Sequence, residues 1–147
     1  MPEINVSFFA IAVAVVVNFI VSFIWYTPLF GRAWKKAVGL ENAPEPTGAR
    51  LALMLGTNAL ALFLIAFILS NNIAAWTPKT WGSTLPGLSA IAQGLSASLF
   101  TWIGFFLPVV ANTVVWEGRP LKLLLINGAY YLVVLLIAGQ IITHLSR

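Results

Sequence analysis

Charged residues divide this chain into four long uncharged runs. Charges occur at Glu3, between Arg32 and Arg50, at Lys79, between Glu117 and Lys122, and at Arg147. The runs between them cover residues 4–31, 51–78, 80–116 and 123–146. Each exceeds the roughly 20 residues that a helix needs to cross a bilayer. The pattern therefore predicts an all-α integral membrane protein, a four-helix bundle in a single transmembrane domain over residues 1–147.

The predicted membrane helices cover about 5–27, 49–75, 87–115 and 121–145. A fifth, short helix is expected at about 30–39, where Phe30, Trp34 and Ala37 recur at helical spacing with basic residues between them. Gly39 is its expected C-terminal cap, and Pro28 is expected to stop the first span. This short helix should lie in the interface, with Arg32, Lys35 and Lys36 in contact with lipid headgroups.

Composition agrees with lipid as the solvent. Hydrophobic residues make up 60% of the chain and charged residues 8%, which leaves too little polar surface for a soluble fold. The net charge of +4 indicates topology and contact with anionic lipid, and no nucleic-acid partner is expected. The first span lacks a basic leading segment, so we expect it to be retained.

The Lys and Arg residues predict an orientation. Two loops carry six of them, and the other side carries only Lys79 and Arg147. The six are Arg32, Lys35, Lys36, Arg50, Arg119 and Lys122. Basic residues in short loops stay in the cytoplasm. We therefore expect the loop after the first membrane helix (loop one) and the loop after the third (loop three) to lie in the cytoplasm. Both termini should lie on the outer side of the membrane, which we expect to be the bacterial inner membrane.

Two features of the third span predict how it packs. Ala90, Gly94 and Ser98 follow one another at four-residue spacing, and such a face of small residues lets a partner helix approach closely. Pro108 removes a backbone donor inside the span, so an opening of the helical ladder is expected between Gly104 and Asn112.

The spans contain no charged residue at depth, and the chain has no cysteine and a single histidine, His144. An intramembrane titrating group of the kind used by proton-coupled transporters is therefore missing. Metal and haem sites lack ligands, so no cofactor and no metal is expected. With no nucleophile, base or metal set in view, an enzyme is disfavoured.

Uncharged polar residues are the remaining candidates for a site. They occur in the inner and middle parts of the spans, where they could converge as a polar core or pocket: Asn18, Ser22, Asn58, Asn112, Asn127 and Tyr131. Interhelical hydrogen bonds that hold the bundle together would explain them, at about 0.6 to 2 kcal/mol each. A polar cavity or solute path would also turn them inward. The sequence leaves both interpretations open.

The segment Trp25-Tyr26-x-Pro28-x-Phe30-Gly31-x-x-Trp34 resembles the DUF1761 family of small bacterial four-helix membrane proteins of unknown function. Ile103-Gly104-Phe105 and Gly118-Arg119 are compatible with the same family. The resemblance implies the fold and supplies no substrate. It marks Trp25, Tyr26, Pro28, Gly31 and Trp34 as the first positions to test.

Two functions compete. The first is a non-enzymatic homo-oligomer that binds or passes a small solute or lipid through an uncharged polar core, since four helices alone enclose little more than their own side chains. The alternative is a membrane anchor or regulatory interaction protein that acts through its basic cytoplasmic loops.

Overall fold

The computed structural model describes residues 4–146, and every regular element within them is helical. Four helical segments are long and apolar enough to cross a membrane: Phe8–Leu29, Gly48–Ala75, Ala90–Trp116 and Leu121–Leu145. The prediction of an all-α chain with four membrane-length helices is confirmed.

The first span consists of α1, Phe8–Ile24, and a π-helical turn, η1, Trp25–Leu29. The Ser7 side chain caps α1 by accepting a hydrogen bond from the Ala10 amide at 3.2 Å. The helical path continues through Pro28 and ends at Leu29, so the expected stop at the proline is corrected by one residue. Pro28 has no N–H to donate to a backbone carbonyl. The next backbone hydrogen bond spans five residues in place of the usual four, from the Phe30 amide to the Trp25 carbonyl at 2.9 Å.

The short helix is α2, Gly31–Val38, and its cap Gly39 has φ 77°, as predicted. Gly31 packs directly against the turn before it. A Cβ atom at this position would lie 2.6 Å from the Tyr26 carbonyl oxygen, so only glycine lets α2 fold back here.

The second span is α3, Gly48–Ala75, followed by the 3₁₀ helix η2, Pro78–Trp81. The third span comprises α4, Ala90–Thr101, the π-helical turn η3, Trp102–Phe106, and α5, Leu107–Trp116. The opening expected near Pro108 is this π turn, which includes Gly104, the residue whose carbonyl the proline leaves without its usual donor. The fourth span is α6, Leu121–Leu145.

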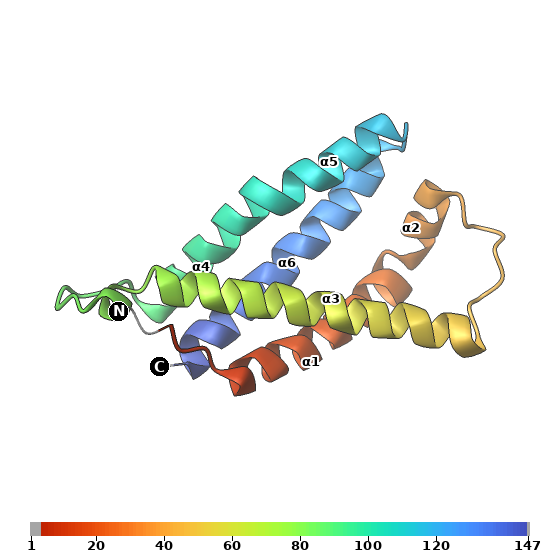
Figure 1. Ribbon diagram of the computed structural model, residues 1–147. Coiled ribbons are helices and arrows are strands. Elements are labelled where there is room, and N and C mark those ends of the chain that lie inside the picture. Colours follow the sequence, from red (N-terminus) through yellow and green to blue (C-terminus); the bar gives the residue numbers. More distant parts are fainter. Residues whose placement is uncertain (1–3, 147) are drawn as a thin grey trace.

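Helix α6 is the centre of the fold (Figure 1). It has the largest set of buried residues of any helix, and α1, α3 and α4 pack against it. The main core joins Ile11 of α1, Leu69 of α3 and Leu135 of α6. The N-terminal half of α3 leaves this core and exposes large apolar side chains such as Leu53 and Met54, as suits a surface in contact with lipid.

The small residues of α4 meet α6, which confirms the expected partner helix. Gly94 and Gly139 face each other so closely that a Cβ atom on Gly94 would lie 2.8 Å from the Gly139 carbonyl oxygen. Beside them, the Ser98 hydroxyl donates a 2.7 Å hydrogen bond to the Leu135 carbonyl. This seam fixes the third span on the fourth.

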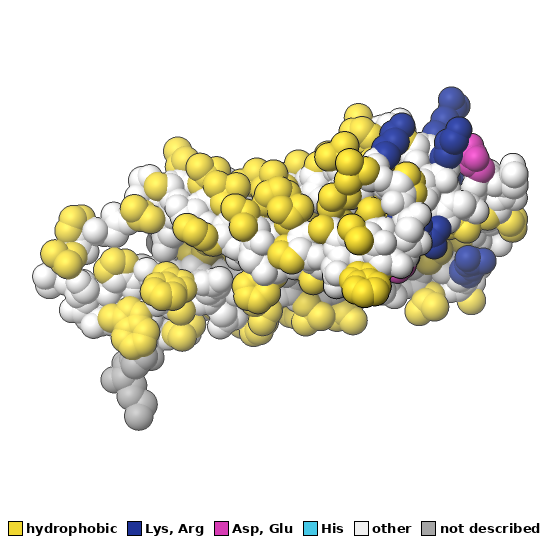
Figure 2. Space-filling view, turned by 90° about the horizontal axis from the view of Figure 1, so that it is seen from above, with side chains coloured by type: hydrophobic (Ala, Val, Ile, Leu, Met, Phe, Trp, Pro, Cys, Tyr) yellow, Lys and Arg dark blue, Asp and Glu magenta, His cyan; other side chains and the backbone are white. Residues whose placement is uncertain are grey.

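The two ends of the molecule differ in charge. The start of α1 and the end of α6 lie at one end, whereas α2 and the turn between α5 and α6 lie at the other (Figure 1). Lys and Arg side chains gather at this second end, and apolar side chains cover much of the surface between the two ends (Figure 2). Which end faces the cytoplasm stays a prediction from the charges.

Candidate functional site

A chain of hydrogen bonds ties α1 to α6. Asn18 is 2% exposed, and its amide nitrogen donates to the Val134 carbonyl at 3.0 Å. The Ser22 hydroxyl donates to the Asn18 carbonyl at 2.8 Å and lies 2.6 Å from the Tyr130 hydroxyl. Since the Ser22 proton is already committed, Tyr130 is the donor in the second contact. Asn18 and Ser22 therefore lie together, in contact with Tyr130.

The segment from Trp25 to Trp34, which we call the first motif, continues this layer toward the end of the molecule where the Lys and Arg side chains gather, which we call the basic end. The Trp25 indole donates to the Ile126 carbonyl at 3.2 Å, and the Tyr26 hydroxyl donates to Asn127 Oδ1 at 2.9 Å. The Trp34 ring meets the Tyr26 ring edge-on, with centroids 5.6 Å apart. Motif residues from η1 and α2 thus attach the first span and the short helix to α6, whereas Pro28 is exposed.

The other predicted polar residues lie elsewhere. Asn58 is half-buried on α3, Asn112 is exposed on α5, and neither side chain has a hydrogen-bond partner within residues 4–146. Tyr131 is half-buried on α6, one turn beyond Asn127, and its ring contacts Phe106 with centroids 4.8 Å apart. The structure brings together Asn18 with Ser22, and Asn127 with Tyr131, and leaves Asn58 and Asn112 apart.

The basic residues form one surface made of two loops. Arg32 and Lys36 are exposed, and Lys35 forms an ion pair with Glu45. The Arg119 guanidinium donates to the Val38 carbonyl at 3.1 Å, which joins the α5–α6 turn to the end of α2. Beneath this surface an apolar cluster packs Ala37 of α2 against α5 and α6. Lipid headgroup contact at these residues stays a prediction.

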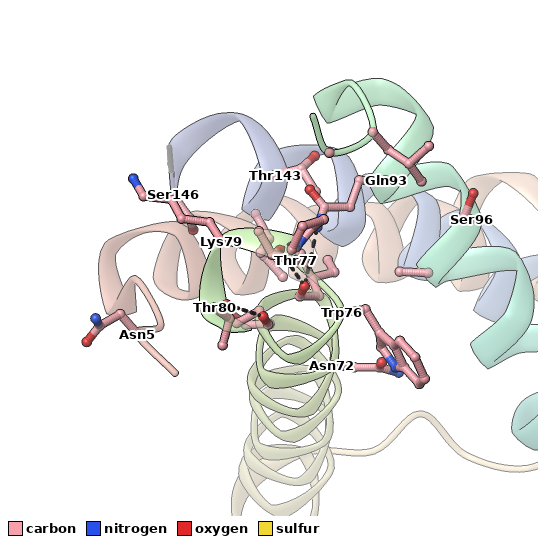
Figure 3. A pocket seen from close by; sticks show the side chains of 18 of the residues that line it. Asn5, Asn72, Trp76, Thr77, Lys79, Thr80, Gln93, Ser96, Thr143 and Ser146 are labelled. Atoms are coloured by element: carbon pink, nitrogen blue, oxygen red, sulfur yellow. Dashed lines mark hydrogen bonds between the residues drawn. The ribbon is translucent and has the colours of Figure 1, made fainter. Parts of the chain in front are cut away.

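A large cavity lies at the opposite end of the molecule, between α3, η2, α4 and the end of α6 (Figure 3). We call it the α3–α4 groove, and its volume is about 1400 Å³. Gln93 and Thr77 bridge it, with 2.6 Å between Nε2 and Oγ1. Lys79 is the single charged residue among the described residues that line it, and Phe100 and Phe105 line its part nearer the middle of the third span.

Several polar side chains of the α3–α4 groove have no partner in the described part of the chain. In a membrane helix, a Ser or Thr hydroxyl can donate to the backbone carbonyl four residues earlier, as Ser22 and Thr113 do outside the groove and Thr143 does within it. The hydroxyls of Ser70, Ser96 and Thr101 make no such bond, and the amide of Asn72 is also free. Thr101 Oγ1 is completely buried as well as unpaired, so a ligand in the groove does not reach it, whereas the other groups are open to the groove. The groove therefore offers hydrogen-bonding groups that the protein itself does not use.

No pattern in the sequence signals this groove. Its hydroxyls are single residues on α3 and α4, and nothing in their spacing separates them from hydroxyls that bond within their own helix. Within residues 4–146, no group of three or more His, Cys, Asp or Glu side chains could hold a metal ion.

A family model described as "Protein of unknown function (DUF1761)" matches residues 9–143, nearly the whole chain. The chain therefore belongs to this family, as its first motif suggested. No curated protein and no solved structure matches it.

Proposed function

We propose that this DUF1761 protein binds a lipid-like amphiphile in the α3–α4 groove and catalyses no reaction. The observation that carries the proposal is the set of unpartnered side chains in one large groove: Ser70, Asn72 and Ser96. In a membrane-embedded wall, unpaired hydroxyls and amides are costly, and a ligand that pairs with them lowers that cost.

The groove is polar at one end and apolar at the other, as an amphiphile is. Lys79, Thr77 and Gln93 line the end formed by η2 and the start of α4. Phe100 and Phe105 line the inner part and are 77% and 70% exposed. A negatively charged headgroup beside Lys79, with its tail along the two phenylalanines, would satisfy both ends.

The test compares lipid retention by two variants. We would reconstitute the protein in nanodiscs that contain phosphatidylglycerol, release it, and count bound lipids by native mass spectrometry. Ser70→Ala combined with Ser96→Ala removes two free hydroxyls of the groove, each worth about 0.5–1.5 kcal/mol, so retention should fall about tenfold. Thr57→Val, an exposed hydroxyl on α3 outside the groove, is the matched control. Equal retention by both variants would remove the basis of the proposal.

We infer further that the protein acts as a homo-oligomer if a solute crosses it, because a single bundle is filled by its own side chains. The alternative function, an anchor or regulator, is favoured by the basic surface, where Arg119 joins the two basic loops. Charge reversal at Arg32 and Lys36 that abolishes recovery of a partner protein, with lipid retention unchanged, would favour that alternative. Recovery that is unaffected by charge reversal would exclude it.

A further inference from the structure

A second groove lies between η3, α5 and α6, and its volume is about 480 Å³. We call it the α5–α6 groove. This volume lies within the range of small-molecule sites. Its lining residues are Phe105, Phe106, Val109, Val110, Thr113, Val114, Leu123, Asn127 and Tyr131. Only Phe105 is shared with the α3–α4 groove, so the two grooves are separate sites that meet at this one side chain.

Two polar atoms of the α5–α6 groove are free to bind a ligand. Among residues 4–146, neither Asn127 Nδ2 nor the Tyr131 hydroxyl has a hydrogen-bond partner. Both atoms are also accessible to solvent-sized molecules. Among the described residues, the unpaired side-chain polar atoms that are inaccessible are Asn18 Oδ1 and Thr101 Oγ1, and neither belongs to Asn127 or Tyr131. Thr113, the third polar residue of the groove, already donates its hydroxyl to the Val109 carbonyl at 2.9 Å.

The two free groups are held in place by their neighbours. Tyr26 donates to Asn127 Oδ1 at 2.9 Å, which fixes the amide and leaves its NH₂ group as the available donor. Tyr26 is itself fixed by ring contacts with Trp34 and Tyr130 at 5.6 and 4.9 Å. The Tyr131 ring lies between Phe106, at 4.8 Å, and Tyr130, at 5.1 Å. Such preorganised donors lose little freedom when a ligand arrives.

The depth of these groups limits what can reach them. Asn127 and Tyr131 follow Lys122 by five and nine residues on α6. At about 1.5 Å per residue, they lie roughly 7 and 13 Å along the helix beyond that cation. With Lys122 in the headgroup layer, which is about 5–8 Å thick, Asn127 lies at its inner edge and Tyr131 lies in the hydrocarbon, where water and charged headgroups supply no acceptor. A ligand that reaches both groups is therefore an apolar molecule with its own acceptor.

We propose that the α5–α6 groove binds a neutral, lipid-soluble molecule whose ring carbonyl accepts hydrogen bonds from Asn127 Nδ2 and the Tyr131 hydroxyl. None of the described residues that line the groove is charged, which favours a neutral ligand. The rings of Phe105, Phe106 and Tyr131 suit a planar ring, and Val109 and Val110 suit an apolar tail. Quinones are the chemical class that combines these features.

The test uses a benzoquinone with a decyl tail, titrated into the protein in phosphatidylcholine nanodiscs and followed by quenching of tryptophan fluorescence. The dimethyl ether of the corresponding hydroquinone is the control ligand, since it keeps the ring and tail but lacks the carbonyls. Because it does not quench tryptophan itself, its affinity is measured by how well it displaces the quinone. We expect saturable binding of the quinone and weaker binding of the ether. Absence of saturable binding, or equal affinity for both compounds, would overturn the proposal.

Three variants locate the site. Tyr131→Phe keeps the ring and removes one hydrogen bond, so the affinity for the quinone should fall about three- to tenfold. Thr57→Val, on α3 and outside both grooves, should leave the affinity unchanged. Asn127→Leu combined with Tyr26→Phe should weaken binding at least as much without leaving the Tyr26 hydroxyl unpaired. If Thr57→Val and Tyr131→Phe behave alike in folded protein, or if excess phosphatidylglycerol displaces the quinone, the assignment is wrong.

Discussion

Replacing Gly139 with alanine adds one methyl group at the tightest contact between α4 and α6. The new Cβ atom would lie 2.3 Å from Ser98 Oγ and 2.7 Å from the Gly94 carbonyl oxygen. Ordinary carbon–oxygen contacts are longer, so the two helices must separate. Rotation of Ser98 relieves the first contact, but the second involves backbone and persists.

The cost is set by this geometry. Overpacking of a tight core costs about 1–3 kcal/mol. Separation also stretches the 2.7 Å bond from Ser98 to the Leu135 carbonyl, and an interhelical bond in lipid is worth about 0.6–2 kcal/mol. Alanine returns up to about 1 kcal/mol through its better helix propensity. We therefore expect Gly139→Ala to lower the free energy of unfolding by about 1–4 kcal/mol.

Gly56→Ala is the matched control, because a Cβ atom on Gly56 of α3 would have no neighbour within 4 Å. The same substitution should stabilise the protein there by up to about 1 kcal/mol, so the two variants differ in sign. Unfolding in mixed micelles with increasing dodecyl sulfate, followed by circular dichroism, measures both. If Gly139→Ala is as stable as Gly56→Ala, the close seam between α4 and α6 is wrong.

Three other substitutions test separate contacts. Ser22→Ala leaves the Tyr130 hydroxyl unpaired and should destabilise by about 1–3 kcal/mol, and adding Tyr130→Phe should recover part of the loss in the same unfolding assay. Gly31→Ala places a Cβ atom 2.6 Å from the Tyr26 carbonyl oxygen, so α2 should detach from the first span and Trp34 fluorescence should shift to longer wavelength. Gly39→Asn is the control, because asparagine tolerates the left-handed cap conformation and should leave that emission unchanged. Cysteines at Lys36 and Lys79 should react with an impermeant reagent from opposite sides of the membrane, and labelling from one side would exclude the predicted topology.

The sequence predicted best the features that are signalled within one segment of the chain, namely the spans, a helix end and a close helix contact. Long gaps between charges revealed the four spans, because a bilayer excludes charge along the whole length of a helix. Gly39 revealed the end of α2, and the small residues Gly94 and Ser98 revealed a close helix contact. Each of these signals can be recognised within a single segment of the chain.

The direction that each polar residue faces could not be predicted. In lipid, both the buried and the outward faces of a helix are apolar, so hydropathy gives the depth of a residue and not the side on which it lies. Asn18 and Asn58 looked equivalent by depth, yet Asn18 is buried against α6 and Asn58 has no partner in the described part of the chain. The grooves were missed for the same reason, since their walls come from residues such as Ser70 and Thr101 that form no pattern within one helix.

The two π turns explain why a groove lies beside α6 at the basic end. Trp25 begins η1 and Trp102 begins η3, and their indoles donate to α6 carbonyls only two residues apart, Ile126 at 3.2 Å and Gly128 at 2.8 Å. Two spans are therefore fastened to the central helix at one level and change their helical winding at that same level. Phe105 and Phe106 belong to η3 and line the α5–α6 groove, so the winding change at η3 shapes the wall opposite Asn127. The tryptophan of the first motif acts on the other side, where η1 presents Tyr26 to the Asn127 amide. One wall of the groove and the Tyr26 hydroxyl that orients the Asn127 donor thus both come from π turns, and π turns within α-helices recur at functional sites, which adds to the case for a ligand there.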